Sequence, residues 1–413
     1  MNTTLRSDTG IDSPAMRMAG RERLSLALMD ARNHTLHLLA RFEEALAAGL
    51  QLPQREGLEP PMWIAAQVAW WAERWIVRNP RRGEGAFSPA DGLRLPSMLA
   101  QADACFDPQL VPAEARWAQR LDPPELRDWM LQTLEATLEL LDKTEDADAA
   151  LHLFRAALFH EDARGEQLIT LAQSLGLPLR LAPPEAIATR EPLWLPAMRW
   201  RLGSQGPGFA FELERPAREE AVPEFEIDAQ AVSWAQFVEF VDDGGYDRPE
   251  LWHPEGWAWV QAQGRRAPGL VEQIGVASGA VLQSWFGRPT RMAGAQPVMH
   301  VSWWEADAWT RWAGRRLPSE LEWEVAAHMA AARGFRWGEV LEWTAGRLRP
   351  WEGHSPQGWT VDTPFDPRPF WGQARVLRGA SFATRSRMKH PKARGFALPG
   401  RDEAFVGFRS CAI

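Results

Sequence analysis

The hydrophobic pattern of the chain changes near residue 176, and this change limits the possible folds more than any other feature. Before it, long runs carry apolar residues at helical spacing with few β-branched clusters. After it, short β-like runs alternate with many Gly and Trp residues. The stretch 177–196 contains five prolines, which is typical of a linker. The pattern therefore predicts a two-domain α+β protein with a helical first domain, as its length of 413 residues also favours.

The first half predicts four long helices, at residues 22–48, 61–78, 124–142 and 146–175. Pro60-Pro61 and Pro123-Pro124 stand where helix starts tolerate proline, and Gly49 and Gly176 stand where helices often end. A longer connection separates the second and third segments. The arrangement is typical of a four-helix bundle with one long connection.

The second half predicts an irregular α+β domain held together by aromatic packing. We expect β-like runs at 224–227 and 297–301, and helices at 234–241, 302–313 and 319–331. The predicted organisation is a disordered N-terminus at 1–20, a bundle at 21–176, a linker at 177–196 and the second domain at 197–413.

Charge and cysteine content disfavour several classes of function. The 54 acidic residues outnumber the 46 basic ones, giving a net charge of −8, so neither nucleic acid nor an anionic membrane is an expected partner. No signal peptide or membrane span is recognisable. The only cysteines, Cys105 and Cys411, cannot form a disulfide framework, which favours the reducing cytoplasm. A small-molecule or protein partner is expected.

Five ordered strings in the second half carry a family resemblance; they lie at residues 297–303, 312–324, 338–344, 378–382 and 407–409. They resemble the formylglycine-generating-enzyme-like, or sulfatase-modifying-factor, domain, which has a C-type-lectin-like fold. The paired cysteines of formylglycine generation should follow Phe382, but residues 383–387 contain none. That activity requires thiolates and cannot be carried over.

The first half is similar to the DinB-like helical bundle, and the combination resembles ergothioneine-type and selenoneine synthases. The strings 390–411 and 242–259 look closest to the selenoneine branch. The resemblance implies iron(II) held by three histidines and oxygen-dependent joining of a selenosugar or thiol donor to hercynine. A facial ligand set with open positions suits iron that must bind oxygen and substrate.

The expected ligand positions are altered. The first falls four residues after Trp63 and is Gln67; the His-x-x-x-His pair of the fourth helix has become His160 and Arg164. A glutamine carbonyl could stay near a metal, so His160 and Gln67 remain the candidate ligands. An arginine cannot bind a cation, because its guanidinium is charged and only donates hydrogen bonds. We expect Glu161, Asp162 or Glu166 to be its counter-ion.

Three hypotheses follow from the residues and the resemblance. The leading one is a selenoneine or ergothioneine-type synthase that uses iron, oxygen, hercynine and a selenium or sulfur donor and retains His160 as an iron ligand. The second is a metal-free, non-catalytic relative that binds a small betaine or a protein partner, which Gln67 and Arg164 favour. The third is an altered metal site in which His152, Glu161 and Gln67 converge.

Candidate substrate-binding residues lie near the C-terminus. Arg394, Arg401 and Asp402 are the polar groups best placed by the resemblance, although the neighbouring Gly395 lacks the carboxamide of the related string. Trp343, together with other tryptophans, could form an aromatic wall for a trimethylammonium group through cation–π attraction. The chain has 23 tryptophans, so a packing role competes with this interpretation.

Overall fold

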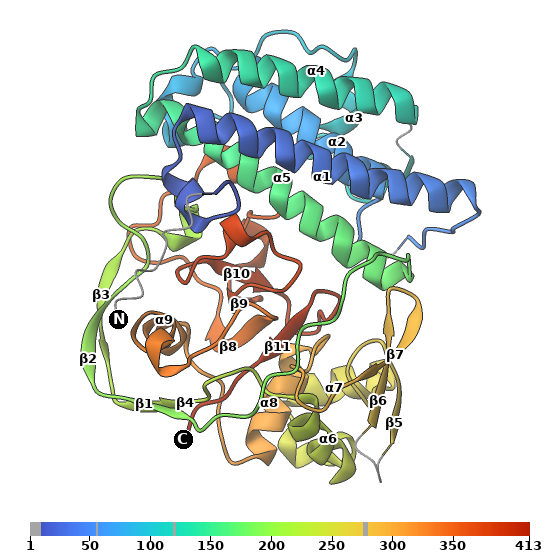
Figure 1. The fold of residues 1–413 in the computed structure, drawn as a ribbon, viewed down its shortest axis with the longest axis vertical. Helices are drawn as coiled ribbons and strands as arrows, with labels where there is room; N and C mark the ends of the chain where they lie inside the picture. Colours follow the sequence, from blue (N-terminus) through green and yellow to red (C-terminus); the bar gives the residue numbers. More distant parts are fainter. Residues whose placement is uncertain (1–9, 55–56, 119–120, 276–279) are drawn as a thin grey trace, which may run out of the picture.

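The long helices of the first half lie side by side on one side of the molecule, above a second, mixed domain (Figure 1). The computed structural model describes residues 10–54, 57–118, 121–275 and 280–413. The bundle helices are α1 (Arg21–Ala47), α2 (Pro61–Ala72), α4 (Pro123–Asp142) and α5 (Asp148–Leu175). The connection from α2 to α4 contains η2 (Glu73–Val77), η3 (Arg82–Phe87), α3 (Ala102–Phe106) and η4 (Ala115–Ala118). The predicted four-helix bundle with one long connection is confirmed.

The helix ends follow from the expected residues. Pro61 and Pro123 occupy first-turn positions, where the missing amide hydrogen costs no helical hydrogen bond. Helix α5 ends at Gly176, whose φ of 66° lies in the left-handed region that a side chain disfavours. Apolar residues of α1, α2, α4 and α5 form one buried cluster that includes Leu28, Trp63 and Phe159.

The second domain is built from small sheets. The largest has the order β10-β9-β8-β11, in which β11 pairs parallel to β8 and the other neighbours are antiparallel. The strands are β1 (Leu193–Leu195), β2 (Met198–Leu202), β3 (Arg218–Val222), β4 (Phe225–Ile227), β5 (Val271–Gly275), β6 (Ala280–Trp285), β7 (Arg288–Met292), β8 (Leu341–Arg347), β9 (Arg375–Gly379), β10 (Arg394–Ala397) and β11 (Val406–Phe408). The helices are α6 (Trp234–Asp242), α7 (Pro254–Gln263), α8 (Trp303–Trp312) and α9 (Glu320–Met329). The irregular α+β domain is therefore confirmed.

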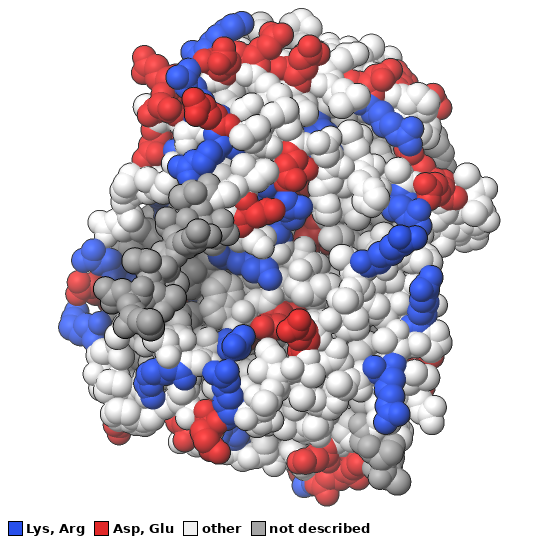
Figure 2. All heavy atoms as spheres, in the orientation of Figure 1, with Lys and Arg blue, Asp and Glu red and all other residues white. Residues whose placement is uncertain are grey.

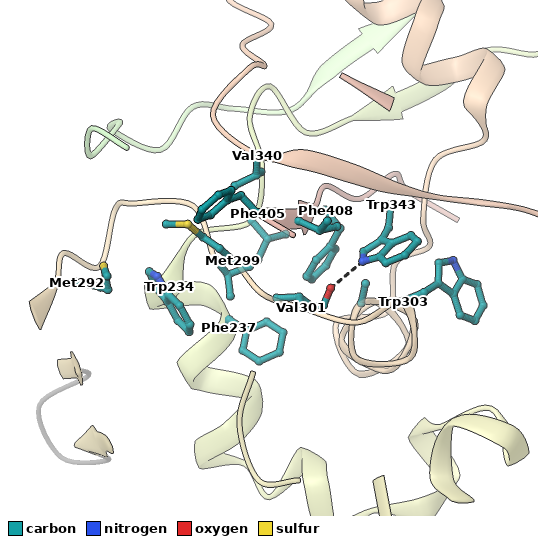
Figure 3. Close-up of a cluster of buried hydrophobic side chains, with 14 of the residues drawn as sticks. Trp234, Phe237, Met292, Met299, Val301, Trp303, Val340, Trp343, Phe405 and Phe408 are labelled. Atoms are coloured by element: carbon teal, nitrogen blue, oxygen red, sulfur yellow. Dashed lines mark hydrogen bonds between the residues drawn. The ribbon is translucent and has the colours of Figure 1, made fainter. Parts of the chain in front are cut away.

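Trp343 lies at the centre of this domain rather than on a pocket wall. Its side chain is fully buried and points into a cluster that includes Phe237 and Phe408 (Figure 3). Its indole nitrogen donates a hydrogen bond to the Val301 carbonyl oxygen at 2.7 Å. With no exposed face, this ring packs in the core and presents no surface to a trimethylammonium group.

Three local expectations differ from the structure. Residues 297–301 contain only an isolated bridge at Pro297, not a strand. Helix α7 was not expected, because Gly256 interrupts the helical pattern. The predicted disorder of residues 1–20 does not extend to η1 (Pro14–Met18), where Arg17 forms a buried ion pair with Glu214 at 2.5 Å. Residues 1–9 lie outside the described residues.

None of the helices in the described ranges combines the length and the apolar character that crossing a membrane requires.

Replacing Ser319 with alanine should lower the free energy of unfolding by about 1 kcal/mol. Ser319 caps α9: its hydroxyl accepts from the Glu322 amide at 3.1 Å, while the Glu322 carboxylate accepts from the Ser319 amide at 2.7 Å. The loss would be measured by urea denaturation. The exposed Ser355→Ala variant is the control and should change the free energy by less than about 0.5 kcal/mol. Equal effects in the two variants would contradict a capping role.

Candidate functional site

Two bundle helices bring together the residues at the expected ligand positions. Trp63, Gln67 and Trp71 are spaced four residues apart on α2 and therefore share one face. His160 and Arg164 have the same spacing on α5. All five side chains are almost fully buried, with no more than 2% of each residue exposed. The seam between α2 and α5 is thus the place to test for a metal site.

His160 is held as a neutral aromatic ring. Its imidazole stacks on Trp71 with a centroid separation of 5.1 Å and an interplanar angle of 19°. Burial, reinforced by the positive charge of Arg164, holds the pKa of His160 well below its usual value. Its Nε2 atom has no hydrogen-bond partner among the described residues. The ring could accept or donate one further hydrogen bond.

Arg164 belongs to a charged cluster that excludes a cation. One of its terminal nitrogens donates to Glu59 at 2.7 Å and to Gln167 at 2.9 Å. The other oxygen of Glu59 accepts from Arg116 at 2.5 Å. Burial alone would raise the pKa of Glu59, but Arg164 and Arg116 together hold it below its usual value. A guanidinium beside His160 repels a metal dication and offers it no lone pair.

Gln67 is also turned to another partner. Its amide nitrogen donates to the Phe106 carbonyl oxygen at 2.6 Å. The alternative set of His152, Glu161 and Gln67 does not converge, because Glu161 pairs with Arg32 at 2.8 Å and His152 packs against the rings of Phe209 and Trp359. Within the described ranges, no group of three or more His, Cys, Asp or Glu residues could hold a metal ion. These residues do not fit an iron ion.

The counter-ion of Arg164 comes from a place that sequence spacing did not indicate. Glu59 lies just before α2, whereas the three expected acidic residues of α5 have other partners. Glu161 pairs with Arg32 inside the bundle. Asp162 pairs with Arg387 of the second domain at 2.6 Å, and Glu166 accepts from Ser381 and Thr384. Asp162 and Glu166 therefore form contacts between the bundle and the second domain.

A small cavity adjoins the Arg164 cluster where the bundle meets the second domain. This interdomain pocket has a volume of about 190 Å³ and is lined by Gly57, Leu58, Glu59, Ile64, Gln167, Thr170, Leu171, Arg401, Glu403 and Ala404. Arg401 donates to Glu403 at 2.8 Å and to the Gly57 carbonyl oxygen at 3.3 Å. The pocket thus combines charges of both signs with apolar walls. Sequence reasoning identified Arg401 but missed Glu59, Gln167 and Glu403, which no motif marks.

The structure does not bring the other candidate binding residues to this pocket. Arg394 pairs with Glu320 at 2.7 Å and lies 4.7 Å from the Trp351 ring, within the second domain. Asp402 pairs with Arg265 at 2.6 Å and is not among the residues that line the pocket. Burial raises the pKa of Asp402 to about 6, so this carboxyl can change charge near neutral pH. Only Arg401 of the three lines the interdomain pocket.

The visible surface shows no field of a single sign. Lys and Arg side chains are interspersed with Asp and Glu side chains over both halves of the face in Figure 2. A nucleic-acid site would place its basic side chains together in a patch or stripe. The face in Figure 2 therefore gives no support to a nucleic-acid site.

Comparison with known proteins agrees with this organisation. The family model described as the sulfatase-modifying factor enzyme 1-like domain matches residues 182–339. The chain is 31% identical to hercynine oxygenase of Mycolicibacterium smegmatis and 30% identical to that of Mycobacterium tuberculosis, each alignment covering 95% of this chain and 99% of the relative. It is 32% identical to the formylglycine-generating enzyme of Streptomyces coelicolor over 41% of this chain and 57% of that protein.

Proposed function

We propose, on the premise that the chain belongs to the hercynine oxygenase family, that it binds hercynine or a closely related histidine betaine in the interdomain pocket without an iron ion. The family supplies the ligand class. The side chains between α2 and α5 support binding without iron, which is where the proposal differs from the expected iron chemistry. This combination is the metal-free alternative among the hypotheses that the sequence leaves open.

One observation carries the metal-free part of the proposal. Arg164 occupies a ligand position, and its guanidinium is bonded to Glu59 and Gln167. Binding iron beside His160 would require this buried cation to leave, which would strand Glu59 with Arg116 alone. Removing one partner of a buried charged pair costs about 3–5 kcal/mol. The ion cluster of Glu59, Arg116 and Arg164 and a bound iron ion are therefore mutually exclusive.

The interdomain pocket suits a small zwitterion. A betaine carries a trimethylammonium group and a carboxylate, and Glu403 and Arg401 offer charges of both signs on the same wall. Leu58, Ile64 and Leu171 provide apolar surface for the methyl groups and the ring. Few polar groups on apolar walls are typical of small-molecule pockets.

Oxygen-dependent coupling of hercynine to a selenosugar or a thiol is the second candidate. The family favours it, as does the buried Nε2 atom of His160, which lacks a protein partner within the described residues. This reaction would need the metal that Gln67 and Arg164 do not hold. It therefore ranks below simple betaine binding.

Isothermal titration calorimetry of the chelator-treated protein with hercynine tests the proposal. We expect binding without added iron, and an Arg401→Ala variant should bind roughly tenfold more weakly, as loss of one charge-assisted contact predicts. The exposed Arg291→Ala variant on β7 is the control and should bind as the native protein does. Binding that appears only after iron is added would reject the metal-free proposal, and binding in neither state would reject the betaine.

A further inference from the structure

A second cavity opens at the opposite end of α5. This pocket, here called the η3–α5 pocket, has a volume of about 470 Å³. It is lined by η3, the first turns of α5, the loop 204–208, residues 212–217 and the segment 353–357. His152 on its wall precedes Gln167 of the interdomain pocket by 15 residues, a rise of about 22 Å along a helix. The two pockets are therefore separate sites.

Two polar atoms on the wall of this pocket have no hydrogen-bond partner within the described ranges. They are Glu212 Oε1 and Arg215 Nε. Glu212 is only 2% exposed, and its other oxygen accepts from the backbone amide of Gln357 at 2.7 Å and the Thr360 hydroxyl at 2.8 Å. An unsatisfied buried polar atom costs about 1–3 kcal/mol, so the buried Glu212 oxygen indicates a place that a ligand completes.

Glu212 places a carboxylate on a wall that also carries the Arg215 guanidinium. The nearest recorded nitrogen to its unsatisfied oxygen is Nε2 of His354, at 3.8 Å, too far for a hydrogen bond. The other carboxylates on the wall already have partners, since Asp148 pairs with Arg155 and Glu84 with Arg81. Arg215 donates to the carbonyl oxygens of Gly206 and Gly208. Glu212 therefore leaves one charged acceptor oxygen for a donor-rich, positively charged group.

His152 adds no competing charge. Burial lowers the pKa of His152 to about 4, against the opposing effect of a hydrogen bond with the Gln357 side chain, so the ring is neutral at pH 7. It packs against Phe209 at 5.1 Å and against Trp359 at 6.0 Å, which fix its position. The Glu212 carboxylate is thus the acceptor on this wall that suits an ammonium group, because that group donates three hydrogen bonds and accepts none.

An apolar side chain stands at the rim. Phe87 lines the pocket with 84% of its surface exposed, beside Ala86 and Pro207. An exposed aromatic ring next to a polar wall is suited to cover the apolar body of a ligand. The pocket therefore has a carboxylate on its inner wall and an apolar ring at its rim.

We propose that the η3–α5 pocket binds a small primary amine, with its ammonium group on Glu212 and its apolar body against Phe87. This site is independent of the interdomain pocket and of the betaine. No covalent step is involved. The bound ammonium would supply the donor that the buried Glu212 oxygen lacks.

Calorimetric titration of the full chain with 2-phenylethylamine at pH 7 tests the site, with 2-phenylethanol as the uncharged counterpart of the same shape. We expect the amine to bind and the alcohol to bind at least roughly tenfold more weakly, because a charge-assisted contact is lost. The Glu212→Gln variant should lose a similar factor for the amine. The exposed Glu219→Gln variant on β3 is the matched control and should bind normally.

Phe87→Ala provides a second variant that does not disturb a buried group. It should weaken the amine through lost apolar contact while leaving the urea midpoint of the free protein unchanged. Equal affinity for the amine and the alcohol, undiminished amine binding in Glu212→Gln, or binding of neither compound would each overturn the proposal. If neither compound binds, ordered water would be the partner of the Glu212 oxygen.

Discussion

Replacing Arg387 with methionine is expected to lower the free energy of unfolding by about 3–5 kcal/mol, because it leaves a buried carboxylate without its cation. Arg387 has no exposed side-chain surface, and its guanidinium bonds both oxygens of Asp162 at 2.6 and 2.7 Å. A third contact reaches Asp30 on α1 at 2.9 Å. Arg387 belongs to the second domain and both carboxylates belong to the bundle, so the loss should loosen the interface.

Guanidinium denaturation followed by tryptophan fluorescence would measure the change. Arg311→Met is the control, since the Arg311 side chain is 45% exposed where it pairs with Asp307, and its loss should cost no more than about 1 kcal/mol. Burial raises the pKa of Asp162, and without Arg387 this carboxyl should take up its proton more readily still. The deficit of the variant should therefore shrink as the pH falls. A loss equal to that of the control would mean that the interface does not depend on this pair.

Restoring histidine at both altered positions should create an iron site. The Gln67→His/Arg164→His protein is expected to hold iron close to one equivalent after anaerobic reconstitution, whereas the native protein should hold far less. The physical reason is that the double change removes the buried guanidinium and places three imidazoles on the seam. Elemental analysis after desalting gives the measurement.

Two further variants make the result decisive. Adding His160→Ala to the double variant should abolish the gain, and Gln67→His alone should not produce it, because Arg164 still repels the metal. Circular dichroism checks that Glu59, then paired only with Arg116, does not unfold the bundle. Stoichiometric iron in the native protein that disappears in His160→Ala would contradict the metal-free proposal and favour the oxygen-dependent synthase.

The features predicted from sequence were those encoded locally. Prolines at helix starts, Gly176 at a helix end and regular apolar spacing indicated the bundle, because each acts within a turn or two of its own position. The motif strings indicated the second domain and the altered ligand positions. The boundaries given for the domains and the linker remain predictions.

What sequence could not provide was the choice of long-range partners. Arg164 has three acidic residues nearby on its own helix, yet it pairs with Glu59, which is 105 residues away. The reason is that Glu161, Asp162 and Glu166 face Arg32, Arg387 and the Ser381 hydroxyl instead. Similarly, the sequence around Trp343 does not distinguish a tryptophan of the core from one that lines a pocket.

Helix α5 contacts both the other bundle helices and the second domain. Of its 28 residues, 18 are buried, and its polar side chains reach the bundle through Glu161 and the second domain through Asp162, Glu166 and Gln173. A new polar side chain on this helix is therefore tolerated only where a neighbouring residue can bond it. Position 164 is such a place, since Glu59 and Gln167 receive the arginine. The bundle can therefore hold a buried arginine at this position because Glu59 and Gln167 bond it from outside the contacts that join α5 to the second domain.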